Sequence, residues 1–70
     1  QKENADALKG SGFAQFEKGE LNDALTNLQK SLKLLAYQPD VQCKIGWIYN
    51  EGGDFEKAVE EFTKAKKLNP

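Results

Sequence analysis

Apolar residues recur along this chain at intervals of three and four positions, which is the spacing of amphipathic helices rather than of strands. The clearest stripe runs from about Leu21 to Leu35 and consists of Leu21, Ala24, Leu25, Leu28, Leu32 and Leu35. A looser stripe, from about Glu3 to Lys18, contains Ala7, Leu8, Phe13, Ala14 and Phe16. A third leads to Leu68 through Phe55, Ala58, Val59, Phe62 and Ala65. These patterns predict an all-α chain.

Glycine, proline and aspartate mark the predicted helix boundaries. Gly19 ends the first helix, because a residue without Cβ tolerates the left-handed conformation common at a helix C-terminus, and Gly52-Gly53 breaks the third. Pro39 suits a first helical turn, where its missing N–H costs nothing. Asp54 is placed to cap the fourth helix by accepting a hydrogen bond from its first-turn amides. These signals predict two helix-turn-helix hairpins.

A shift of 34 residues superimposes the second predicted hairpin on the first. The shift pairs small residues with small and large with large, as in Gly12 with Gly46, Gly19 with Gly53, Ala24 with Ala58, Leu28 with Phe62, and Leu21 with Phe55. Agreement at so many positions indicates an internal repeat.

Gly12 and Gly46 need a structural reason, because a glycine inside a helix costs about 1 kcal/mol relative to alanine. We expect Gly12 to face Ala24 across the first hairpin and Gly46 to face Ala58 across the second. Small residues at these crossings would let the helix backbones pack closely and gain dispersion contacts.

With these residues in place, the sequence resembles the tetratricopeptide repeat family, whose 34-residue motif has large and small residues at fixed positions. The second copy keeps Ile45-Gly46, Tyr49, Gly53-Asp54-Phe55, Ala58, Phe62, Ala65 and Pro70. The first copy departs from the motif at Ser11, Gln15, Ser31 and Ala36. The resemblance implies one domain over 1–70, with repeats at about 5–38 and 39–70 stacked as a short right-handed α-solenoid of four helices.

The resemblance also implies a concave groove, lined by the first helix of each hairpin, that holds a peptide or partner protein. Carried over by position, the groove residues are Lys9, Phe13, Phe16, Glu17, Cys43, Trp47, Asn50 and Glu51. Phe13 and Trp47 are equivalent, so we expect them side by side as an aromatic anchor. The alternative is that Phe13, Phe16 and Trp47 are covered by packing between hairpins.

Some grooves of this family clamp the C-terminal carboxylate of heat-shock chaperones with lysine and asparagine side chains. Only Lys9 matches here, because Phe13 and Lys44 stand where the clamp has asparagines. The sequence therefore argues against a chaperone tail as the ligand.

Composition narrows the function classes further. The chain has ten lysines, no arginine, eleven acidic residues and a net charge of −1, which disfavours nucleic acid as a partner. Without histidine and with Cys43 as its one cysteine, it lacks a metal-ligand set, a disulfide and a base that would activate the thiol. We therefore expect no cofactor, no metal and no enzymatic activity. The unpaired thiol and the absence of a membrane-length apolar stretch predict an intracellular, cytoplasmic protein.

The leading hypothesis is thus a protein-interaction scaffold. The alternative is a structural spacer or self-associating unit without a ligand groove, and RNA binding by helical hairpins of longer period is a third class. An apolar face around Val59, Phe62 and Leu68 and a start at Gln1 without methionine suggest a fragment of a longer array. That face would then bind further repeats or a second copy.

Overall fold

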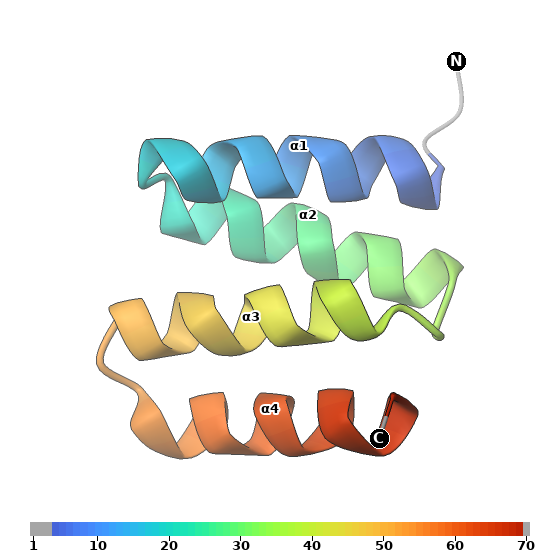
Figure 1. Cartoon of the computed structure of the whole chain (residues 1–70). Helices are drawn as coiled ribbons and strands as arrows, with labels where there is room; N and C mark the ends of the chain where they lie inside the picture. The colour runs from blue at the N-terminus through green and yellow to red at the C-terminus, as the bar shows by residue number, and fades with distance from the viewer. Residues whose placement is uncertain (1–3, 70) are drawn as a thin grey trace.

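The computed structural model describes residues 4–69 and consists of four helices joined by short turns (Figure 1). The helices are α1 (Ala5–Lys18), α2 (Leu21–Leu34), α3 (Pro39–Glu51) and α4 (Phe55–Leu68). Helices α1 and α2 form one antiparallel hairpin, called hairpin one, and α3 and α4 form hairpin two (Figure 1). The predicted all-α class with paired hairpins is confirmed. The predicted helix start near Glu3 and the final Pro70 lie outside the described residues.

Side-chain caps fix two of the helix starts. The Asn4 side chain accepts a hydrogen bond from the Ala7 amide at 2.8 Å and opens α1. Asp54 accepts from the Lys57 amide at 3.3 Å and opens α4, as predicted. Pro39 occupies the first turn of α3, also as predicted.

The turns inside the two hairpins have the same backbone structure. Gly19 and Gly53 adopt φ values of 82° and 87°, the left-handed conformation. After each glycine, the next amide donates back across the turn: Glu20 to the Gln15 carbonyl and Asp54 to the Tyr49 carbonyl, both at 2.9 Å. The hydrogen bond that closes the turn of hairpin one therefore has its counterpart 34 residues away in hairpin two.

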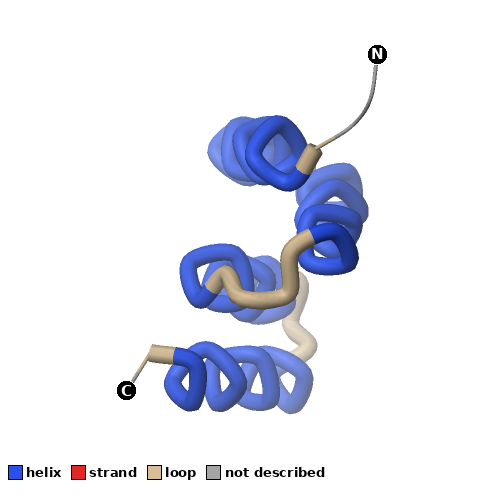
Figure 2. The backbone as a smooth tube through the Cα atoms, turned by 90° about the vertical axis from the view of Figure 1, so that its right-hand side faces the viewer, coloured by secondary structure: helices blue, strands red, loops and turns tan. Residues whose placement is uncertain are grey.

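The core lies between the hairpins. Ala24 and Leu28 of α2 cluster with Val41, Ile45 and Ile48 of α3, and all five are almost completely buried. In the end-on view α3 lies beside both α2 and α4, so the two hairpins share this helix as their common packing element (Figure 2). Burying these aliphatic side chains supplies much of the chain's hydrophobic stabilisation.

The two mid-helix glycines face large side chains, which corrects the prediction that they face alanines. A Cβ atom on Gly12 would lie 2.5 Å from Leu28 Cδ2, and one on Gly46 would lie 2.7 Å from Cε1 of Phe62. The Ala24 atom nearest to the Cβ position on Gly12 is its carbonyl oxygen, at 3.3 Å. The glycines therefore make room for Leu28 and Phe62, which lie one helical turn after Ala24 and Ala58. The two alanines are themselves buried.

Hydrogen bonds of the Gln38 side chain stabilise the turn between the hairpins. Its side-chain amide donates to the carbonyls of Ser31 and Leu35 and to the Ser31 hydroxyl, at 2.8 to 3.1 Å. The Ser31 hydroxyl in turn donates to the Ala5 carbonyl at 2.8 Å. Serine at position 31, a departure from the repeat motif, thus links α1, α2 and the entry to α3.

The outer side of α4 is open to solvent. Phe55 and Val59 are each 63% exposed, whereas Leu21 and Leu25, the equivalent residues of α2, are half-buried against the core. Among the four helices of residues 4–69, none combines the length and hydrophobicity needed to cross a membrane.

Two glycines of α1 allow a matched test of this packing. We expect Gly12→Ala to lower the free energy of unfolding by about 1–2 kcal/mol, because overpacking against the fully buried Leu28 outweighs the gain in helix propensity. Gly10→Ala, at an exposed site with no atom within 4 Å of the added methyl group, should raise it by up to about 1 kcal/mol. Urea unfolding measures both, and an equal effect of the two substitutions would contradict the packing assigned to Gly12.

Candidate functional site

The candidate site is the surface formed by the first helices of the two hairpins, called the α1–α3 face. Both helices lie on the same side of the stack in the end-on view (Figure 2). Helix α1 supplies Lys9, Phe13, Phe16 and Glu17, and helix α3 supplies Cys43, Trp47, Asn50 and Glu51. Each of these side chains is half-buried or exposed, so all are reachable from solvent.

Lys44 lies over the two phenylalanines of α1. Its ammonium group is 5.3 Å from the ring centroid of Phe13 and 4.7 Å from that of Phe16. At these distances the cation is attracted to the negative faces of the rings. Sequence comparison alone missed this role, because it assigned Lys44 only as a mismatch to the carboxylate clamp.

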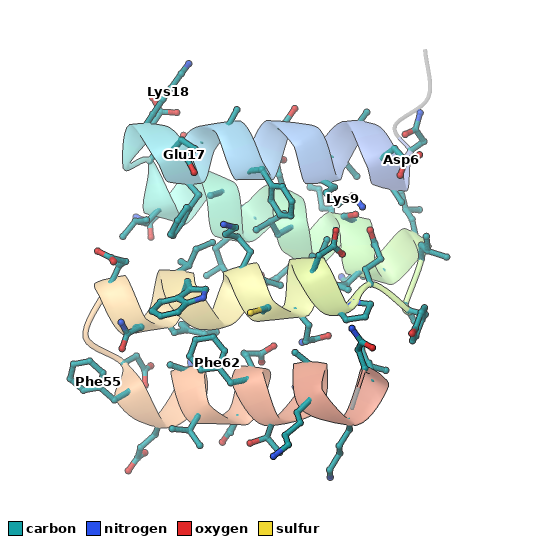
Figure 3. All side chains as sticks on the ribbon, viewed as in Figure 1. Asp6, Lys9, Glu17, Lys18, Phe55 and Phe62 are labelled. Carbon is teal, nitrogen blue, oxygen red and sulfur yellow. The ribbon has the colours of Figure 1, made fainter. Side chains whose placement is uncertain are left out.

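Trp47 contacts a residue of its own hairpin. Its ring packs edge-on against Phe62 of α4, with centroids 5.2 Å apart and ring planes at 70°. Phe62 is labelled in Figure 3 and lies between α3 and α4. Phe13 and Trp47, which were expected to lie side by side, therefore each contact another residue. Lys44 lies over the Phe13 ring, and Phe62 packs against the Trp47 ring. Trp47 nevertheless remains 46% exposed.

Lys9 is engaged in an ion pair that joins the hairpins. Its ammonium nitrogen lies 3.1 Å from Oδ2 of Asp40, and it extends from α1 toward α3 (Figure 3). The other Asp40 oxygen accepts a hydrogen bond from the Val41 amide at 2.8 Å. Both partners are partly exposed, so the pair contributes at most about 1 kcal/mol. The ion pair leaves Lys9, the one residue that matches the carboxylate clamp, already bound to Asp40.

Cys43 lines an open groove of about 590 Å³ between α3 and α4. The other lining residues are Pro39, Asp40, Phe62, Ala65, Lys66 and Asn69. The thiol is free and half-buried. Among residues 4–69, no three His, Cys, Asp or Glu side chains are grouped closely enough to hold a metal ion. We call this groove the α3–α4 groove, and most of its accessible lining is apolar.

A second hollow of about 430 Å³ lies on the α1–α3 face, at the C-terminal ends of both helices. It brings Glu17 of α1 and Glu51 of α3 to the same opening, with Phe16, Gly19 and Leu21 as its remaining lining. Both carboxylates are exposed, and Asn50 next to Glu51 is half-buried. This end of the face offers negative charge beside an aromatic ring.

The contact between Lys44 and Phe16 is measurable by a double-mutant cycle. We expect Lys44→Met and Phe16→Leu to show a coupling energy of about 0.5–1 kcal/mol in urea unfolding, because either substitution alone removes the contact between the ammonium group and the Phe16 ring. Lys33→Met, on the exposed surface of α2, serves as the matched control and should show no coupling to Phe16→Leu. Equal coupling in both cycles would contradict the assigned contact.

Comparisons with known proteins agree with this architecture. Residues 39–70, which contain hairpin two, match the family model described as tetratricopeptide repeat. Protein CTR9 homolog from Arabidopsis thaliana is 34% identical over 61 residues, which is 87% of this chain. The chain spans about 6% of the length of that protein. With the same turns and glycine positions recurring 34 residues apart, the chain belongs to the tetratricopeptide repeat family.

Proposed function

We propose that this chain is a protein-interaction module whose α1–α3 face binds a peptide or a partner protein. Tetratricopeptide repeats generally mediate protein–protein interactions, and the match over hairpin two supports this class of function. The observation that carries the proposal for this particular face is Trp47, which is 46% exposed while its ring is held by Phe62.

A tryptophan held in this way is well suited to anchor a partner. Large aromatic side chains provide much of the binding energy at interfaces, and tryptophan is among the residues most enriched at such positions. Because Phe62 already restricts the Trp47 ring, binding would immobilise little additional side-chain freedom. The half-buried Phe13 and Phe16 add aromatic surface to the same face, beside the Lys44 ammonium group.

The charges of the face favour a partner with basic residues. Lys9 is paired with Asp40, and Lys44 lies over two aromatic rings. Within residues 4–69, no ion pair engages Glu17 or Glu51. A lysine or arginine of the partner would therefore find carboxylates beside the ring of Phe16, whereas a C-terminal carboxylate would find its matching cation already in use.

A second function is favoured by a different observation. Phe55 and Val59 expose 63% of their surface on the outer side of α4, where stacked repeats make contact. We propose that this side is an association surface, for a further hairpin or for a second copy of the chain. The two functions use different surfaces and are compatible.

Peptide selection followed by substitution tests the α1–α3 face. Peptides are selected from a random display library on the immobilised chain, and their affinities are measured by fluorescence anisotropy. We expect Trp47→Ala to lower the affinity of the selected peptides at least about 30-fold, because the substitution removes a central aromatic anchor.

Phe55→Ala truncates an aromatic residue away from the face and should change affinity less than about twofold. Trp47→Phe keeps a ring against Phe62 and controls for folding. The proposal is wrong if the selected peptides bind the Trp47→Ala variant as tightly as the unmodified chain.

A further inference from the structure

Gln38 stands between the hairpins with a buried side chain and a backbone that already belongs to α3. The residue is 4% exposed, and its main-chain carbonyl accepts the first hydrogen bond of α3, from the Gln42 amide at 3.0 Å. Pro39 follows directly and restricts the backbone at the start of the helix. A bond made by the Gln38 side chain therefore acts on the direction in which α3 leaves the turn.

The Gln38 amide is bonded to the end of hairpin one. Its Nε2 atom donates to the Leu35 carbonyl at 2.8 Å and to the Ser31 hydroxyl at 3.0 Å. Ser31 is fully buried and continues the link to α1, because its hydroxyl donates to the Ala5 carbonyl at 2.8 Å. One chain of well-formed hydrogen bonds thus connects the start of α3 with both helices of hairpin one.

The polar links between the hairpins lie at this end of the molecule. Besides the bonds of Gln38, the ion pair of Lys9 and Asp40 joins α1 to the first turn of α3. Among residues 4–69, no hydrogen bond or ion pair joins the hairpins at the opposite end, where Glu17 and Glu51 line the hollow. Apolar packing is non-directional and allows a range of helix crossing angles, so the links at the start of α3 are needed to fix its angle.

Trp47 is sensitive to this angle because it lies far from the fixed end of α3. The rise of an α-helix places Trp47 roughly 13 Å from Gln38, so a rotation of about 15° around Gln38 would move Trp47 by about 3 Å. The same rotation would shift Lys44 relative to the rings of Phe13 and Phe16, which its ammonium group meets at 5.3 and 4.7 Å. All these contacts belong to the α1–α3 face.

We propose that Gln38 and Ser31 are positioning residues for the α1–α3 face. Their hydrogen bonds fix the angle between α3 and α1, and that angle sets the spacing between Trp47 and the aromatic rings of α1 that a partner must span. The inference rests on the function proposed for this face and adds the device that preorganises it. A face held at one angle binds its partner without the cost of selecting that angle from several.

The chemistry of Gln38 favours a role in orientation over a role in stability. Its Oε1 atom is buried and accepts no hydrogen bond from residues 4–69, an arrangement that costs free energy. A methionine here would remove that cost together with the bonds, and the Ser31 carbonyl would still accept from the Leu35 amide at 2.9 Å. In some proteins, buried polar groups specify one arrangement of helices with little gain in stability.

Gln38→Met tests the proposal, because it keeps the length of the side chain and removes both polar atoms. Residual dipolar couplings of the backbone amides, measured by NMR in a weakly aligning medium, report the orientation of each hairpin separately. We expect one alignment tensor to fit both hairpins of the unmodified chain and two different tensors to be needed for Gln38→Met. The affinity of the peptides selected on the chain should fall about tenfold, as when the competent angle is populated about one-tenth of the time.

The urea midpoint of Gln38→Met should equal that of the unmodified chain, whereas a residue that only stabilised the fold would lower the midpoint and leave one tensor. Gln29→Met makes the same chemical change on the exposed surface of α2 and should alter neither the couplings nor the affinity.

Ser31→Ala removes the link to Ala5 and keeps the Gln38 bonds to two carbonyls, so its effects should be smaller and in the same direction. Alanine stands at the equivalent position of α4, Ala65, so this variant is expected to fold and carries the test if Gln38→Met does not.

A single tensor for both hairpins in Gln38→Met and in Ser31→Ala would overturn the proposal. Unchanged peptide affinity in a variant whose hairpins need two tensors would overturn it as well. The couplings are measured without peptide, so they are independent of where the peptides bind. If Trp47→Ala leaves peptide binding unchanged, the proposed function fails, and the couplings alone decide whether Gln38 sets the angle between the hairpins.

Discussion

The packing of α3 against α2 is the interaction on which the rest of this structure depends. Val41, Ile45 and Ile48 are the largest contribution of hairpin two to the buried cluster, and they meet Ala24 and Leu28 of hairpin one. The opposite side of α3 holds α4, where Gly46 admits the ring of Phe62. A two-hairpin chain has too little interior for each hairpin to be stable alone, so one shared helix must complete both.

That constraint also explains how the candidate surfaces differ. Once α3 is seated, Lys9 reaches Asp40 and Lys44 reaches the rings of α1, so the α1–α3 face is held together by polar and cation–π contacts that leave Trp47 accessible. The α4 face has no covering helix among the described residues and keeps its aliphatic and aromatic side chains exposed. We propose the first surface as a binding site for a peptide or partner protein, and the second as a surface for association with a further hairpin or a second copy.

Local signals in the sequence predicted the backbone well, because helix boundaries depend on nearby residues. Gly19, Pro39 and Asp54 acted as expected, and α2 ends at Leu34 rather than near Leu35. The contacts between side chains were harder to predict from the sequence. Repeat matching shows which positions are equivalent but not which side chain fills a gap, so Leu28 and Phe62 replaced the alanines expected opposite the glycines. Lys44 was missed because a long flexible side chain reaches residues that no helical spacing connects to it.

Equilibrium unfolding in urea, followed in one sample by Trp47 fluorescence and by far-ultraviolet circular dichroism, tests the shared core most directly. Trp47 reports on hairpin two, whereas the dichroism reports on all four helices. If α3 completes both hairpins, the two signals will show one transition with the same midpoint and slope. Two transitions, with Trp47 changing at a different urea concentration from the helical signal, would show that the hairpins are stable separately and would contradict this account.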